Sequence, residues 1–231
     1  MGAQPKVHLH AGWLVGLISF GALALGACSD PPGTLVALAN FDNDTVDARP
    51  NALLPGDPQE DILSLAGQTL VRGGPLFATK YLEITRGSAM ARVRLLRETV
   101  VLPYRRYKMA LTGAVTAAEA SIEIRFVAAT RGEVSVSFES SGAVNAVAAG
   151  ATYEIGRWEL GVPHTITVDM DLDSSHSSIK YETRNTARLT SSLALTQSNQ
   201  AELMIELSYP PTTLEAFPGT YNVDRMSIAG L

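Results

Sequence analysis

The stretch SIEIRFVAATRGEVSVSFE, residues 121–139, decides the class of fold. Ile122, Ile124 and Phe126 alternate with polar residues, and the same alternation resumes at Val134. Successive side chains of a β-strand point to opposite faces, so the pattern predicts two strands that each bury one face. Residues 130–132, Thr-Arg-Gly, supply a turn between them. The stretch therefore predicts a β-hairpin.

Period-two alternation continues along the chain, and no segment carries a sustained 3.6-residue apolar period. Residues 110–120 come nearest to a helix, but Gly113, Val115 and Thr116 weaken that interpretation. Many short strands with one buried face imply two antiparallel sheets packed face to face. We therefore expect an all-β fold, a single two-sheet antiparallel β-sandwich over residues 35–231. Further strands are expected at residues 35–41, 89–95, 165–172, 202–207 and 221–228.

The composition narrows the class of protein. Of 231 residues, 46% are hydrophobic and 18% are charged, which is apolar enough to form a core. Cys28 is the only cysteine, so the chain holds no internal disulfide framework and no cysteine-rich zinc site. A formal net charge of -5 argues against a general nucleic-acid-binding protein, and no nucleic-acid partner is expected.

The N-terminus carries a targeting pattern. An apolar run at residues 13–25 follows the basic Lys6, and its 13 residues would span about 20 Å as a helix, short of the ~30 Å hydrocarbon core of a bilayer. This length is typical of the hydrophobic region of a signal peptide. The run ends in Leu25-Gly26-Ala27-Cys28, which resembles the lipobox of bacterial lipoproteins.

The lipobox resemblance implies how the chain is processed. Residues 1–27 would be the cleaved lipoprotein signal peptide, Cys28 would carry a diacylglycerol and further acyl chains such as palmitate, and residues 28–34 would form a short tether. Two or three acyl chains anchor a protein firmly in membrane lipid, whereas one holds it marginally. Ser29 after the cysteine resembles outer-membrane sorting, so we expect a lipid-anchored protein of the cell envelope, at the outer membrane. The alternative is a buried thiol in an ordinary cleaved secretory peptide.

Both ends of the expected domain resemble those of concanavalin A-like jelly-roll domains. The apolar residues 35–41 run into Asp42-Asn43-Asp44, and a Tyr-x-Val-Asp-x-x-x-Ile strand occupies residues 221–228. Trp158 followed by residues 163–169, PHTITVD, is similar to the middle of laminin-G-like members of that group. The resemblance implies that the two terminal strands lie side by side. It implies a fold, and a fold alone does not fix a function.

The patterns of jelly-roll enzymes are missing from the sequence. Jelly-roll glycanases carry a Glu-x-Asp-x-x-Glu strand with two catalytic carboxylates. Glu123-Ile124-Arg125 is the nearest approach, and its second acid is absent. Jelly-roll lyases use a His and a Tyr, but His164 and His176 sit in no matching motif. The sequence therefore favours a non-catalytic protein and assigns no catalytic residue.

A calcium ion is the one metal that the resemblance suggests, and no cofactor is required. In carbohydrate-binding jelly rolls, a structural Ca²⁺ often ties the first strand to the last, which by resemblance makes Asp42 and Asp224 its candidate ligands. Calcium needs six to eight oxygens, to which Asp44 and nearby carbonyls could contribute. The alternative is that these acids are strand-end and turn residues.

A basic segment runs from Lys80 to Lys108, with eight basic residues against Glu83 and Glu98. Guanidinium groups bind carboxylate, sulfate and phosphate through paired hydrogen bonds, so a basic strip could hold an anionic glycan or lipid headgroups. The alternative is a solvated sheet face paired with neighbouring acidic strands. Trp158 could stack on a sugar ring, or lie half-buried at a sheet edge. The candidate ligand-binding residues are Arg92, Arg94, Tyr104, Arg106 and Trp158.

The sequence thus predicts a membrane-anchored, non-catalytic β-sandwich that binds a glycan or another envelope component. Its expected partners are membrane lipid, through acylated Cys28, and an anionic glycan or an envelope protein. One alternative is a structural or assembly subunit that docks on a protein partner through an exposed sheet edge. The other is a jelly-roll hydrolase or lyase whose catalytic residues are dispersed.

Overall fold

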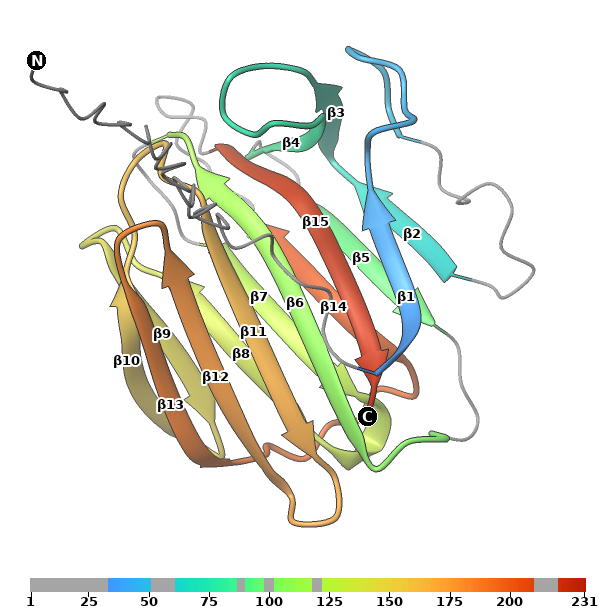
Figure 1. The fold of residues 1–231 in the computed structure, drawn as a ribbon, viewed down its shortest axis with the longest axis vertical. Coiled ribbons are helices and arrows are strands. Elements are labelled where there is room, and N and C mark those ends of the chain that lie inside the picture. The colour runs from blue at the N-terminus through green and yellow to red at the C-terminus, as the bar shows by residue number, and fades with distance from the viewer. Residues whose placement is uncertain (1–32, 51–60, 87–89, 98–101, 118–121, 210–219) are drawn as a thin grey trace, which may run out of the picture. The chain divides into compact units, whose positions relative to one another are not determined.

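The computed structural model describes residues 33–50, 61–86, 90–97, 102–117, 122–209 and 220–231. Within these residues the chain forms β-strands, and one short 3-10 turn, η1 (Ala129–Arg131), is the only helical element. The strands form two antiparallel sheets packed face to face, so the predicted all-β sandwich is confirmed (Figure 1). Residues 1–32, which contain Cys28 and the expected signal peptide, lie outside the described residues.

Sheet A contains both ends of the described domain. Its strand order is β13-β12-β11-β6-β15-β4-β3, and β1 also pairs with β15. The start of β15 pairs with β4 and its end pairs with β1, which confirms that the first and last strands lie side by side. The strands are β1 (Thr34–Asn40), β3 (Gln68–Arg72), β4 (Tyr81–Thr85), β6 (Arg106–Val115), β11 (His164–Asp171), β12 (His176–Thr183), β13 (Ala187–Ala194) and β15 (Thr220–Gly230).

Sheet B packs behind sheet A in the order β10-β9-β8-β7-β14-β5-β2 (Figure 1). The predicted hairpin forms within it, because β7 and β8 pair across η1. The sheet also places β14 between β5 and β7, far from both in the sequence. Its strands are β2 (Asp61–Ala66), β5 (Ala91–Arg97), β7 (Ile122–Ala128), β8 (Glu133–Phe138), β9 (Ala143–Ala148), β10 (Ala151–Arg157) and β14 (Leu203–Tyr209).

The inward faces of the two sheets form the hydrophobic core. Ile124 and Phe126 of β7 and Ile166 and Val168 of β11 are fully buried, as their alternation with polar residues predicts. Full burial of one such side chain contributes about 2 kcal/mol to folding. The polar residues between them are thereby placed on the two outer faces, which are the surfaces open to a ligand.

No helix within the described part of the chain is long and apolar enough to cross a membrane.

Candidate functional site

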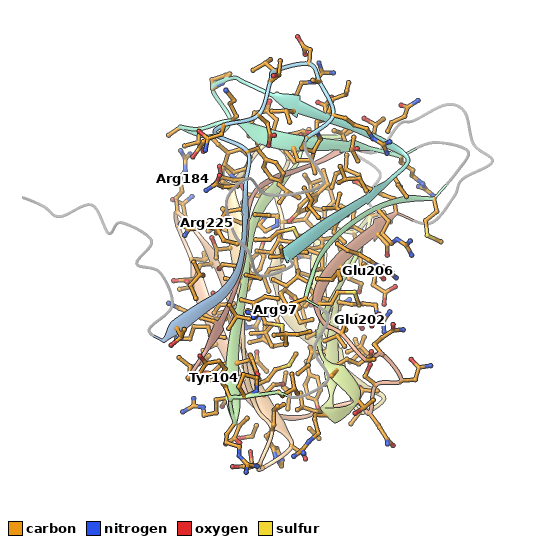
Figure 2. All side chains as sticks on the ribbon, turned by 90° about the vertical axis from the view of Figure 1, so that its right-hand side faces the viewer. Arg97, Tyr104, Arg184, Glu202, Glu206 and Arg225 are labelled. Carbon is orange, nitrogen blue, oxygen red and sulfur yellow. The ribbon has the colours of Figure 1, made fainter. Side chains whose placement is uncertain are left out.

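The outer face of sheet B carries a cross-strand cluster of charged side chains. Arg92 and Arg94 point outward from β5, Glu206 from β14, and Arg125 from β7, since the residues between them face the core. Glu206 lies opposite Arg94 on one neighbouring strand and opposite Arg125 on the other. These four residues are called the Glu206 cluster below. Figure 2 shows Glu206 on the side of sheet B that faces away from sheet A.

Glu206 is the centre of this cluster. One of its oxygens, Oε2, accepts a hydrogen bond from Arg94 Nε and lies 3.9 Å from Arg92 Nη1. The other oxygen lies 3.6 Å from Arg125 Nη1. Its side chain is only 7% exposed, so the three guanidinium groups offset the cost of burying a carboxylate.

Arg125 links the cluster to β8. Its Nη2 lies 2.5 Å from Glu133 Oε2. Partial burial lowers the pKa of Arg125, but the hydrogen bond to Glu133 and the charges of Glu133 and Glu206 outweigh burial and raise this pKa above its ordinary value. The face continues with the half-buried hydroxyls of Ser135 and Ser137. The arrangement offers fixed hydrogen-bond donors and acceptors at close spacing, as polar ligands rich in hydroxyl groups require.

The structure does not bring all the predicted basic residues together. Arg106 begins β6 of sheet A and Tyr104 lies just before it, whereas Arg92 and Arg94 lie on β5 of sheet B. Figure 2 places Tyr104 and Glu206 on opposite sides of the sandwich. Arg106 Nη2 donates to Asp169 Oδ2 at 2.9 Å, and Arg105 Nη1 donates to Asp173 Oδ1 at 3.0 Å. Arg105 and Arg106 are thus solvated cations that pair with neighbouring acids, which was the alternative to a ligand-binding strip.

The aromatic candidates both make structural contacts. The Tyr104 ring covers the backbone of Gly230 so closely that an added Cβ there would lie 2.1 Å from a ring carbon. It also meets the ring of Tyr107 edge-on, with centroids 5.9 Å apart. Trp158 is partly buried against the core, and its Nε1 donates to the carbonyl of Glu139 at 2.8 Å. Trp158 thus lies half-buried just beyond the end of β10, as in the alternative to sugar stacking, a half-buried position at a sheet edge.

The ammonium group of Lys80 binds backbone carbonyls at the position predicted for calcium. Lys80 Nζ donates to the backbone carbonyls of Asp42 at 2.9 Å and Asp44 at 2.8 Å. The neighbouring Thr79 hydroxyl donates to Asp224 Oδ1 at 2.6 Å. Burial raises the pKa of Asp224, and the charge of Asp42 raises it further against the opposing effect of the Thr79 hydrogen bond.

This arrangement does not fit a calcium ion as it stands. Calcium would have to displace the Lys80 ammonium from both carbonyls and still find further oxygens. Within the described residues, no three acidic, histidine or cysteine side chains gather as a metal site. Lys80 supplies the positive charge at this junction of the first strand, β4 and the last strand.

The histidine with the most perturbed pKa lies in the core. His164 Nε2 and the Tyr221 hydroxyl are 2.7 Å apart, and both side chains are buried between the sheets. Burial lowers the pKa of His164 to about 3, against a weaker opposing effect of a backbone hydrogen bond at Val162. Because neither group reaches solvent, this His–Tyr pair contacts no ligand on the surface.

Two surface features were missed by the sequence analysis. Arg125 and Glu206 were recognised as polar positions of predicted strands, but their meeting depends on a strand order that alternation does not give. Arg49 belongs to a short segment that runs beside β3 and contributes to a groove there. Its sequence neighbourhood carries no motif that would have revealed it.

The comparisons with known proteins concern the fold. No protein-family model and no curated protein matches the chain. Among solved structures, the catalytic domain of a GH131 beta-glucanase from Podospora anserina aligns with a TM-score of 0.57 at 14% identity, over 86% of this chain and 97% of that one. Lectin II from Ulex europaeus aligns with a TM-score of 0.53 at 10% identity, over 85% of this chain and 99% of the lectin.

A third solved structure is far longer than this chain. A sialidase aligns with a TM-score of 0.50 at 9% identity over 73% of this chain, which spans only 16% of the sialidase. At such identities the alignments bear on the fold alone. Together with the two antiparallel sheets and the pairing of β1 with β15, they show that the chain is a concanavalin A-like β-sandwich.

Proposed function

We propose that this protein is a lipid-anchored, non-catalytic glycan-binding protein of the bacterial cell envelope. The Glu206 cluster on the outer face of sheet B is its proposed binding surface. The observation that carries this proposal is the nearly buried Glu206 held by arginines from both neighbouring strands. The lectins and the glucanase that share the fold support a glycan as the ligand.

The charges of the Glu206 cluster favour binding of a polar ligand over proton transfer by the Glu206 carboxylate. Both oxygens of Glu206 already face guanidinium groups, so this carboxylate orients the arginines. Arg92 and Arg94 remain about a third and a quarter exposed, with side-chain exposures of 32% and 26%. Their remaining N–H donors are available to hydroxyl or carboxylate oxygens of a sugar.

The proposed anchor is Cys28, on the strength of the lipobox resemblance of residues 25–28. Only residues 29–33 separate it from the first residue of β1. Five residues reach at most about 18 Å when extended, so the sandwich would stay close to the membrane surface. A glycan within that distance of the lipid would be the natural ligand.

The test is a glycan array probed with the detergent-solubilised full chain. The double variant Arg92→Gln/Arg94→Gln should lose at least about tenfold in affinity for at least one class of glycan that the wild type binds. The matched control, Arg105→Gln/Arg106→Gln on sheet A, should stay within about twofold, because those cations lie on the opposite sheet. Equal losses in both double variants, or a blank array with folded wild-type protein, would contradict the proposed surface.

A second candidate function is docking on an envelope protein through the edge strand β13. This strand ends the order of sheet A, its side chains are mostly exposed, and Leu189 is 65% exposed. An exposed edge can add a strand from a partner. Mild crosslinking in membranes should then capture one protein in fixed ratio, and Leu189→Lys should abolish that product. Crosslinking that yields no fixed partner would argue against this second function.

A further inference from the structure

A groove lined by both polar and apolar atoms lies on the outer face of sheet A, over β3 and β4. It has a volume of about 590 Å³, within the roughly 300–1,000 Å³ of small-molecule sites. Leu70 and Arg72 of β3 and Glu83 and Thr85 of β4 line it, and Val71 and Leu82 beside them face the core. The lining also includes Arg49, Gly67, Gln68 and Thr69, and the site is called the Arg49 groove below.

Backbone pairing places Arg49 at the groove. The amide of Asp47 donates to the carbonyl of Val71 at 2.8 Å, and the amide of Val71 donates to the carbonyl of Ala48 at 2.9 Å. The segment therefore runs along the edge of β3 and brings the next residue, Arg49, to the lining. Its guanidinium makes two long hydrogen bonds, from Nε to Thr69 Oγ1 at 3.5 Å and from Nη2 to the carbonyl of Gly67 at 3.4 Å.

Gly67 lines the end of the groove beside Arg49, and it places only backbone atoms there. It has a φ of +78°, and an added Cβ would lie 2.7 Å from the Cα of Ala91. The chain crosses at Gly67 from β2 in sheet B to β3 in sheet A. A glycine is needed there both for the positive φ and for the close approach.

The two arginines of the groove differ in their partners. Arg72 donates to Glu83 at 3.0 Å and also to Asp47. The Glu83 hydrogen bond, and then the Asp47 hydrogen bond, raise the pKa of Arg72 above its ordinary value. Arg49 has no carboxylate partner among the described residues, and its two long bonds leave three of its five N–H donors for a ligand.

We propose that the Arg49 groove binds the carboxylate-bearing sugar unit of an acidic glycan. Arg49 holds the carboxylate through two parallel hydrogen bonds, Leu70 packs under the ring, and Thr85 and Glu83 meet its hydroxyls. Arg72 is already paired with Glu83 and Asp47. Arg49 is therefore the cation of the lining that is left to bind a carboxylate. Inorganic phosphate lacks the ring and the hydroxyl groups that Leu70, Glu83 and Thr85 would contact. The inference rests on the proposed glycan-binding function and adds a second surface with its own sugar class.

The test measures binding of three probes to the detergent-solubilised full chain: a glucuronate-containing disaccharide, its glucose counterpart and inorganic phosphate. Wild type should bind the glucuronate compound at least about tenfold more tightly than the other two. Arg49→Gln should weaken glucuronate binding by about tenfold or more, while the matched surface variant Arg188→Gln should leave it within about twofold. A ligand-dependent NMR shift of the Leu70 methyl groups should accompany binding and locate it in the groove.

The outcomes separate the groove from the Glu206 cluster. If Arg49→Gln binds like wild type while Arg92→Gln/Arg94→Gln does not, the groove is refuted and the proposed function stands. Equal affinity for the glucuronate and glucose compounds would refute the carboxylate selection, and tighter binding of phosphate would do the same. If wild type binds no glycan of any kind, both the groove and the proposed function fail.

Discussion

The two carboxylate oxygens of Glu206 contact three arginines, but these contacts differ in length and burial. The contribution of Glu206 to stability can therefore be measured apart from the contribution of Arg92. Glu206→Ala would leave the partly buried Arg94 and Arg125 without a central partner, so we expect the free energy of unfolding to fall by about 2 kcal/mol. Arg92→Gln should cost less than about 1 kcal/mol, because its contact is 3.9 Å long and its side chain is a third exposed. Urea unfolding of both variants measures the two losses of unfolding free energy, and equal losses in Glu206→Ala and Arg92→Gln would contradict the expected difference.

His164 should make the protein sensitive to acid. Burial holds the pKa of His164 at about 3, below its ordinary 6.5, so the folded protein binds fewer protons than the unfolded chain between these values. Stability is therefore present above about pH 6.5 and is lost as the pH falls toward 3, by roughly 3 kcal/mol at about pH 4.5.

The variant His164→Gln should flatten that pH dependence, since glutamine does not titrate. The control is His176→Gln, at a residue that lies exposed at the start of β12. The measurement is the urea midpoint at a series of pH values between about 4.5 and 7. An unchanged slope in His164→Gln would assign the acid sensitivity to other groups.

At the scale of the elements, Lys80 joins the segment after β1 to the start of β4. Lys80→Met would leave the carbonyls of Asp42 and Asp44 without their ammonium donor, and we expect a loss of about 1–2 kcal/mol in unfolding free energy. Lys108→Met on β6 is the matched control and should cost less. In wild type, neither calcium nor a chelator should shift the melting temperature. A chelator-induced drop that disappears in Asp224→Asn would show that calcium, not Lys80, stabilises this junction.

Alternation in the sequence predicted seven of the strands, β1, β5, β7, β8, β11, β14 and β15, and the buried face of the most regular among them; it did not locate the other eight strands of the described residues. Ile124 and Val168 are buried as predicted, because the period of two is a property of each strand alone. The order of the strands is not local: β14 lies between β5 and β7 through contacts between residues far apart in the sequence, such as Arg94 and Glu206, which are 112 positions apart. For the same reason the sequence grouped Tyr104 and Arg106 with Arg92 and Arg94, although the chain changes sheet between them.

At the scale of the whole molecule, the proposed anchor predicts where the protein is found. Cys28→Ser should abolish metabolic palmitate labelling and release the protein from membranes, because no other cysteine can take the diacylglycerol. Fractionation and labelling of both forms in a bacterial host provide the measurement. Ser29→Asp, which keeps the acylation site, should retain labelling. Labelling that persists in Cys28→Ser would refute the lipoprotein proposal.

The outer face of sheet B is the surface proposed to contact a glycan. The most direct measurement is the NMR footprint, on side-chain guanidinium signals, of a glycan selected on the array and added to the full chain in detergent. Shifts are expected for Arg92, Arg94 and Arg125, which surround Glu206, whereas Arg105 and Arg106 at the start of β6 should stay unchanged. Shifts confined to Arg105 and Arg106, with the Glu206 cluster unperturbed, would contradict it.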